Sequence, residues 1–301
     1  DRAVICKLIQ YYWKGGDLYH YYFYKIHYYN DISTLYYEDY PRLEVTVPCS
    51  VTDRLADIDQ HALTEIEKAL TELKGESVQE LKMLLLFIRG RLEIFYGQYR
   101  EGLNHLFAGL ELSQILENST MALRIYSQVA LCYMKMGNYE LARENIRQYD
   151  KIAQKTASFM EDGYSLYLWG CIHYYEGRTD ESTNTLWIAL DLYNKCESKR
   201  SYYPVDVAAT YAILGHCCYA RGEYELAMRY YLEGSRVGKI GYLFNGMCEL
   251  YSGIGRAAYR LGWLELAKNY LSEAYQLHSE MGVNKDLDEV LIYQGMIALQ
   301  N

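Results

Sequence analysis

The chain has 301 residues, with 30 basic against 39 acidic side chains and a formal net charge of −9. Phosphate binding requires a basic face, so this balance argues against direct nucleic-acid binding by this segment. Half of the residues are hydrophobic, which is ample for a buried core, and the 35 tyrosines are unusually many. We interpret them mainly as large interior residues whose hydroxyl groups reach the surface.

The cysteines and the hydropathy pattern predict a cytoplasmic protein. Eight cysteines are scattered along the chain without a CxxC pair, and we expect them to be reduced thiols. There is no run of 18 apolar residues and no signal peptide, so we expect neither membrane insertion nor export. The chain opens at Asp1 and stops at Asn301 midway through a repeat, and we interpret it as a piece of something longer.

Residues 1–50 are predicted to form an irregular helical lead-in. Helical patterns cover residues 3–13 and 18–29, with two adjacent glycines between them. Residues 41–48, PRLEVTVP, have a proline at each end and a β-prone centre, so we expect an extended connector there. The remaining residues, 51–301, are predicted to form one domain of helical repeats.

From residue 77 onwards the sequence repeats a helical hairpin. The turns are marked by Gly97, Gly137, Gly177, Gly222 and Gly262, at spacings of 40, 40, 45 and 40 residues. The predicted helix pairs are 77–96 with 99–115, 120–136 with 139–156, 161–176 with 179–195, 206–221 with 224–237, and 243–261 with 264–280. Residues 286–300 repeat the first-helix pattern once more, with Gly295 placed 40 residues after Gly255.

Small residues recur at fixed distances from the turn glycine. Seven residues before it stand Gly90, Ala130, Gly170, Gly215 and Gly255. Five residues after it stand Gly102, Ala142, Ser182, Ala227 and Ala267, and twelve after it Gly109, Tyr149, Ala189, Gly234 and Ala274. Tyr149 is the one large exception. Small residues let the backbones of two antiparallel helices approach closely, and the extra apolar face predicts that each hairpin stacks on its neighbours.

These columns resemble the tetratricopeptide repeat, which has small residues at the helix-crossing positions and an aromatic residue beside the turn. The resemblance covers roughly residues 77–301, although the period exceeds the family's usual value of about 34 residues. It implies an all-α fold, a right-handed superhelical solenoid of about five full hairpins with a degenerate N-terminal repeat and a C-terminal helix. The period and the lead-in resemble the sensor region of bacterial signal-transduction ATPases and transcriptional regulators of the MalT, AfsR and LuxR kind.

No catalytic constellation is evident in the sequence. The phosphate-binding GxxxxGK[ST] loop, HExxH, GxSxG and the EF-hand pattern are all absent, and the seven histidines are dispersed. We therefore expect no enzymatic activity, no cofactor and no metal site in these residues.

The resemblance implies that the first helix of each hairpin lines a concave groove. Carried over residue by residue, the predicted ligand- or partner-binding set is Phe87, Arg91, Arg124, Ser127, Tyr164, Tyr167, Tyr174, His216, Tyr219, Glu249, Arg256 and Tyr259. Arginine with tyrosine is typical of binding hot spots, and arginine can pair with the carboxylates of an extended peptide. A groove that merely packs against its own linker or another domain is the alternative, and the sequence leaves it open.

We hypothesise a non-enzymatic sensor domain of a larger bacterial regulator of transcription. Its groove would bind a peptide, a protein or a small-molecule effector. A stand-alone adaptor or a peptide-pheromone receptor of the Rap and PlcR type is the alternative. Self-association through the helix at 286–300 also stays open at this stage.

Overall fold

The computed structural model describes residues 79–155, 158–195, 203–240, 244–281 and 287–299, and within these ranges the only regular secondary structure is α-helix. The predicted lead-in at 1–50 and the connector at 41–48 lie outside the described residues. The described helices fall into two compact units, which are treated separately below.

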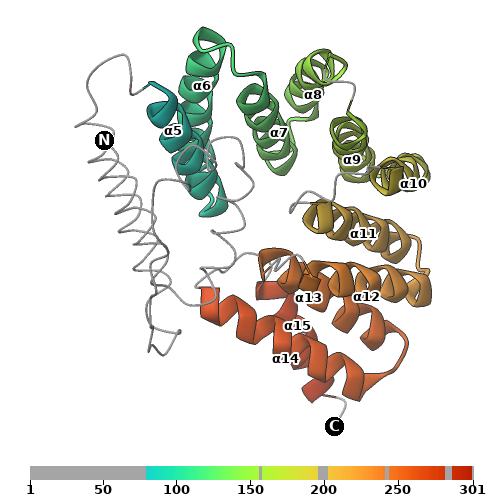
Figure 1. Cartoon of the computed structure of the whole chain (residues 1–301). Helices are drawn as coiled ribbons and strands as arrows, with labels where there is room; N and C mark the ends of the chain where they lie inside the picture. Colours follow the sequence, from blue (N-terminus) through green and yellow to red (C-terminus); the bar gives the residue numbers. More distant parts are fainter. Residues whose placement is uncertain (1–78, 156–157, 196–202, 241–243, 282–286, 300–301) are drawn as a thin grey trace, which may run out of the picture. The chain divides into compact units, whose positions relative to one another are not determined.

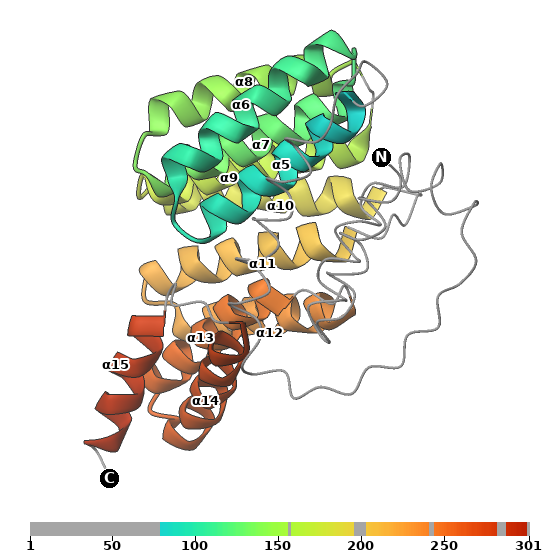
Figure 2. The same cartoon turned by 90° about the vertical axis from the view of Figure 1, so that its left-hand side faces the viewer.

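Unit 1 consists of three antiparallel helical hairpins packed side by side (Figures 1 and 2). They are α5 (Gln79–Phe95) with α6 (Tyr99–Ile115), α7 (Ser119–Lys135) with α8 (Tyr139–Ala153), and α9 (Phe159–Tyr175) with α10 (Thr179–Lys195). The second helix of one hairpin also contacts the first helix of the next, α6 with α7 and α8 with α9. The three hairpins therefore form a continuous stack.

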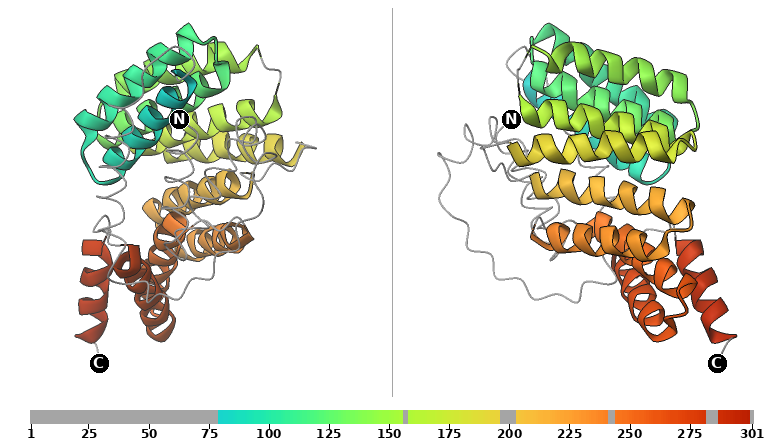
Figure 3. Two further views of the ribbon diagram at one scale, coloured as in Figure 1. Left: turned by 60° about the vertical axis from the view of Figure 1, so that its left-hand side comes forward. Right: turned by 90° about the vertical axis from the view of Figure 1, so that its right-hand side faces the viewer.

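Unit 2 consists of two further hairpins and a last single helix. They are α11 (Tyr203–Ala220) with α12 (Tyr224–Ile240), α13 (Phe244–Arg260) with α14 (Leu264–Met281), and then α15 (Leu287–Ala298). α15 packs on α14 and α13, and Figure 3 shows it in dark red beside α14. The predicted all-α fold of helical hairpins is confirmed, and most helix ends lie within three residues of the predicted ones.

The turn glycines end the first helix of each hairpin in the left-handed region. Their φ angles are 81°, 73°, 78°, 82° and 78° for Gly97, Gly137, Gly177, Gly222 and Gly262. The amide of Gln98 donates to the carbonyl of Glu93 at 2.8 Å, and the same bond joins Glu223 to Cys218 at 2.9 Å. This six-residue closure is a Schellman motif, which needs a residue that tolerates positive φ. Glycine therefore recurs at the turns of the sequence because the backbone has a positive φ there.

The small residues lie where the two helices of a hairpin cross. A Cβ atom on Gly90 would lie 2.7 Å from the carbonyl oxygen of Gly102, and in the third hairpin the hydroxyl of Ser182 donates to the carbonyl of Gly170 at 2.8 Å. The residue seven before the turn glycine is covered by a large side chain of the second helix, which stands nine residues after that glycine. These large residues are all fully buried: Leu106, Ile146, Leu186, Tyr231 and Leu271.

The exception at Tyr149 has a packing explanation. In the first and fourth hairpins the small residue twelve after the turn faces a large one on the next hairpin: Gly109 faces Ile125, and Gly234 faces Leu250. At the position equivalent to Ile125 and Leu250 the third hairpin has Ser165, so the large and small residues exchange places. The Tyr149 side chain is buried, and its hydroxyl donates to a carboxylate oxygen of Glu161 at 2.5 Å.

The start of α11 differs from the sequence prediction. We expected this helix to begin at residue 206, but it begins at Tyr203. Proline is well accommodated in a first helical turn, where its missing N–H has no helical partner and its fixed φ is already helical. Tyr203 and Pro204 therefore belong to the helix and not to the loop before it.

We expect Gly215→Leu to destabilise unit 2 by about 1–3 kcal/mol through overpacking. A Cβ atom at this position would lie only 2.4 Å from Cε1 of the buried Tyr231. Urea denaturation followed by circular dichroism measures the effect. Ala220→Leu, at the exposed end of the same helix, is the control and should change stability by less than about 0.5 kcal/mol. Equal stability of the two variants would contradict the crossing described above.

Candidate functional site

The twelve predicted site residues occupy four repeated positions, which we call the inner columns. These positions lie 13, 10, 6 and 3 residues before the turn glycine. In unit 1 they place Phe87 and Arg91 on α5, Arg124 and Ser127 on α7, and Tyr164, Tyr167 and Tyr174 on α9. In unit 2 they place His216 and Tyr219 on α11, and Glu249, Arg256 and Tyr259 on α13.

The inner columns are not uniformly accessible. Phe87 and Ser127 are 2% and 3% exposed, so their side chains contribute mainly to packing. The Ser127 hydroxyl donates to the carbonyl of Arg124 at 2.8 Å, within its own helix. The other ten predicted residues are partly exposed.

In unit 2 the structure brings His216 and Glu249 together. One ring nitrogen of His216 lies 2.7 Å from the Tyr231 hydroxyl, and the other lies 2.7 Å from a carboxylate oxygen of Glu249. His216 thereby links the crossing of its own hairpin, where Tyr231 fills the space over Gly215, to the first helix of the next hairpin.

Arg256 makes a second link of the same kind. Its guanidinium lies 2.6 Å from Glu289 on α15 and 5.3 Å from the ring centroid of Tyr219 on α11. The Tyr219 hydroxyl is 2.9 Å from that of Tyr293 on α15, and burial together with this hydrogen bond raises the pKa of Tyr219 well above its ordinary value. Tyr259 packs edge-on against Tyr293 at 5.3 Å. All five predicted residues of unit 2 therefore take part in contacts between helices, in one group that joins α11 to α13 and a second that joins α11 and α13 to α15.

The two links are one interaction repeated along the chain. His216 and Arg256 both lie six residues before a turn glycine. Their partners, Glu249 and Glu289, lie in the repeat that follows each of them, at equivalent positions 40 residues apart. Each basic residue therefore precedes its carboxylate by 33 residues. Glu289, Tyr293 and Tyr231 were absent from the sequence prediction, and the 33-residue spacing is the signal that could have identified Glu289.

In unit 1 the same pair of positions holds Arg91 and Arg124, also 33 residues apart. α5 and α7 contact each other, as α11 and α13 do. Arg91 lies over the ring of Phe87, with its guanidinium carbon 5.4 Å from the ring centroid. α7 contains no aspartate or glutamate, so it supplies no carboxylate to this pair. Two basic residues therefore occupy positions that unit 2 uses for an acid and a base.

Two tyrosines of α9, Tyr164 and Tyr167, form an aromatic surface beside α7. Tyr164 and Tyr167 lie 5.5 Å apart between ring centroids, and Tyr164 is 6.0 Å from the buried Tyr149. Tyr164 is anchored through this contact, since Tyr149 is fixed by its hydrogen bond to Glu161. α9 thus presents partly exposed rings on a rigid base.

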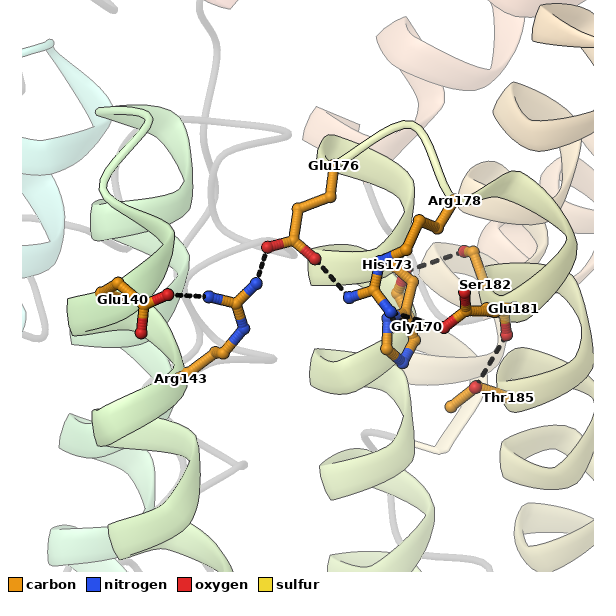
Figure 4. Close-up of polar contacts among 9 residues, drawn as sticks. All are labelled: Glu140, Arg143, Gly170, His173, Glu176, Arg178, Glu181, Ser182 and Thr185. Atoms are coloured by element: carbon orange, nitrogen blue, oxygen red, sulfur yellow. Dashed lines mark hydrogen bonds and ion pairs between the residues drawn. The ribbon is translucent and has the colours of Figure 1, made fainter.

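A row of alternating charges at the turn end of unit 1 was missed by the sequence analysis (Figure 4). Arg143 on α8 pairs with Glu140 at 2.5 Å and with Glu176 at the end of α9, and Glu176 also pairs with Arg178. Nearby, burial and then the charge of Arg178 lower the pKa of His173. The Glu140–Arg143 pair follows helical spacing and the Glu176–Arg178 pair spans the turn, but the bond from Arg143 to Glu176 depends on tertiary packing. We interpret the row as a structural clamp between hairpins.

The described residues show no arrangement suited to metal or nucleophilic chemistry. Within the described ranges, no group of three or more His, Cys, Asp and Glu side chains is placed to hold a metal ion. None of the helices described is long and apolar enough to cross a membrane. Burial raises the pKa of Cys132 to about 11 and that of Cys218 to about 12, which suppresses the reactive thiolate.

Arg256→Ala should destabilise unit 2 by about 1–3 kcal/mol, because it removes a mostly buried partner of Glu289 and Tyr219. Breaking a fully buried ion pair costs about 3–5 kcal/mol. We expect a smaller loss of stability here, because the Glu289 side chain is 54% exposed and solvent screens the pair. Chemical denaturation checks this, with Arg229→Ala on the exposed face of α12 as the control of equal charge. An Arg256→Ala protein as stable as the control would show that these contacts contribute little to folding.

Cys132 and Cys218 should resist a maleimide in the native protein at neutral pH. For Cys132, a rise from 9.0 to about 11 lowers the thiolate fraction about a hundredfold. The folded state holds these protons more tightly than the unfolded state, so the stabilisation is complete below pH 9 and is lost as pH rises towards 11. Mass spectrometry of labelled peptides, with and without denaturant, measures the protection. Equal labelling rates in both conditions would contradict the burial described here.

Comparison with known proteins agrees with this geometry. The family model described as "Tetratricopeptide repeat" matches residues 123–156, which span α7 and α8. No curated protein sequence matches the chain. Among solved structures, a Rap protein complexed with Competence and Sporulation Factor is similar over 100% of this chain and 88% of its own, with 15% identity and a TM-score of 0.63.

Two further structures show the same likeness. NprR in complex with its cognate peptide NprX is similar over 92% of this chain and 72% of its own, with 16% identity and a TM-score of 0.57. A Signal Transduction ATPase with Numerous Domains (STAND) from Pyrococcus horikoshii, which has a tetratricopeptide repeat sensor, is similar over 83% of this chain with 16% identity and a TM-score of 0.54. This chain covers only 36% of that protein. At these identities the likeness establishes the fold alone, a stack of helical hairpins of the tetratricopeptide repeat kind, and the family model matches one of these hairpins.

Proposed function

We propose that this segment is a non-enzymatic sensor of a larger bacterial regulator and that unit 1 binds a peptide or protein effector through its carboxylate groups. The observation that carries the proposal is the occupation of one repeated pair of positions. Unit 2 places His216 with Glu249 and Arg256 with Glu289 there. Unit 1 places Arg91 and Arg124 there.

Two arginines at adjacent positions favour an anion. Like charges repel, and a carboxylate bound to both guanidinium groups removes the repulsion and forms charge-assisted hydrogen bonds. The chain as a whole is acidic, but salt limits its repulsion of the ligand to a distance of about 8–10 Å. The charge close to the bound group therefore decides its sign, and Arg91 and Arg124 each contribute a positive charge there.

The aromatic surface of α9 suits an extended peptide next to the bound carboxylate. Tyr164 and Tyr167 offer flat, partly exposed rings whose orientation is restricted by mutual packing. Rigid tyrosines lose little conformational entropy on binding, which is why they are common in binding surfaces. The combination supports a peptide or a protein segment with an acidic group over a purely apolar ligand.

The comparisons support the class of ligand and the role. The NprR and Rap structures named above each contain a bound peptide or factor, and the STAND protein uses its tetratricopeptide repeats as a sensor. By analogy, binding to this segment would control an ATPase or DNA-binding module of the same regulator. That analogy rests on shared fold, so the effector must be identified by experiment.

We expect Arg91→Ala with Arg124→Ala to weaken binding of acidic peptides at least about tenfold, or about 1.4 kcal/mol. The probe is a set of fluorescein-labelled ten-residue peptides rich in Asp and Tyr, compared with Asn-containing peptides of the same sequence, and fluorescence anisotropy gives the affinity. Arg100→Ala with Arg147→Ala removes the same charge from exposed positions of α6 and α8 and should leave binding unchanged. The unfolding midpoint should be similar in both double variants.

Two results would count against the proposal. Equal affinity of both double variants would remove the arginine pair from the site. Equal affinity of the Asp and Asn peptides would mean that no carboxylate is recognised. If acidic peptides bind as expected, their effect on ATP hydrolysis or DNA binding by the intact regulator tests the sensor role separately.

A further inference from the structure

α15 has two apolar faces, and only one of them is covered in the part of the chain that the structure describes. Val290 and Ile297 are buried against α13 and α14, where the side-chain amide of Gln294 also donates to the carbonyl of Leu271 at 3.3 Å. On the opposite face Leu291, Ile292 and Leu299 are 46%, 58% and 89% exposed. The helix and the residue that follows it thus leave three large aliphatic side chains exposed.

Gly295 lies in the middle of this exposed face. It is 40 residues after Gly255 and so is equivalent to the small residue at each helix crossing. Cβ atoms on Gly90, Gly170, Gly215 and Gly255 would all lie within 3 Å of a side chain of the second helix. A Cβ atom on Gly295 would meet no atom within 4 Å. The face therefore has the form of a helix crossing that has no second helix upon it.

The crossings of the complete hairpins show what kind of helix fits. Each of the two helices brings a small residue followed four positions later by a large one, as in Gly90 with Ile94 and Gly102 with Leu106. The large residue of each helix covers the small residue of the other: the Cβ position of Gly102 is 2.6 Å from Ile94, and that of Gly90 is 2.9 Å from Leu106. The crossing is therefore close to two-fold symmetric.

α15 carries the same spacing in Gly295 and Leu299, and the amide of Leu299 donates to the carbonyl of Gly295 at 3.1 Å, so the helical register continues through both. A helix with this motif is complementary to a second copy of itself in the antiparallel direction. We propose that two copies of this chain associate through α15, with Leu299 of each covering Gly295 of the other. Such an interface is isologous and closes as a dimer.

Charge and size are consistent with an antiparallel pair. The acidic residues of α15, Asp288 and Glu289, lie at its start, and the helix contains no basic residue. With a rise of about 1.5 Å per residue, an antiparallel pair with each Leu299 over the other copy's Gly295 separates the two Asp288 positions by about 27 Å along the axis, beyond the screening length. One helix on each side buries less than the roughly 1,200 Å² of a stable complex, so the dimer should be weak and concentration-dependent.

Sedimentation equilibrium of the chain between about 1 and 200 μM tests the proposal, with a dimer dissociation constant in the micromolar range as the expected result. Gly295→Leu should remain folded, since the position is open within one chain, and should raise that constant at least about tenfold because the crossing of the two copies is blocked. Ile292→Glu should have the same effect. Ile188→Glu, at a similarly exposed position of α10, should leave it unchanged.

Three results would overturn the proposal. A wild-type chain that remains monomeric over the whole range would mean that α15 binds no second copy, whether the face stays in water or another segment of the polypeptide covers it. A dimer that Gly295→Leu and Ile292→Glu leave intact would use a different surface. Equal weakening by Ile188→Glu would indicate nonspecific apolar association. These outcomes are independent of acidic-peptide binding, which depends on unit 1.

Discussion

The close crossing of the two helices in each hairpin is the constraint on which the described structure depends. The carbonyl of Gly102 lies within 2.7 Å of where a Cβ atom of Gly90 would be, so no larger residue fits without moving a backbone. The volume next to each crossing is then filled by a fully buried side chain such as Leu186 or Tyr231. The small residue at the crossing always stands seven residues before the turn glycine, so the first helices of successive hairpins have equivalent residues at equivalent places. Where the repeat is 40 residues long, side chains 33 residues apart in the sequence can therefore meet.

This constraint explains why the fold was predictable from one sequence. The backbone requires glycine at the turn and a small residue at the crossing. Both requirements are therefore visible in the sequence as residue types that recur at fixed spacings. The sequence analysis failed at positions where the fit of one residue depends on its neighbours in the structure. Tyr149 breaks a column of small residues, and its fit depends on Ser165 in the next hairpin. Pro204 lay outside the predicted helix at 206–221, but its place in the first turn of α11 is favourable for proline.

The sequence placed the predicted residues on the first helices of the hairpins, but it did not reveal which side chains they contact. Arg256 and Tyr219 were placed correctly among the residues of the first helices, but the guanidinium is held by Glu289, one repeat further on. Likewise His216 bridges Tyr231 of its own hairpin and Glu249 of the next. A motif carried over from a repeat family names positions within one repeat. The partners of these side chains lie in neighbouring repeats and depend on how the hairpins stack, which a single repeat does not encode.

The contrast between the two units is the strongest reason to assign binding to unit 1. In unit 2 an acid and a base at the repeated pair of positions stabilise the stack, and the ring of Tyr219 completes the arrangement beside Arg256. At the equivalent position unit 1 has Arg124 in place of the acid, so two basic residues occupy the positions that hold an acid and a base in unit 2. Sequences depart from local consistency chiefly where function requires it. An anionic group of a ligand would restore in the complex the charge balance that the chain builds for itself in unit 2.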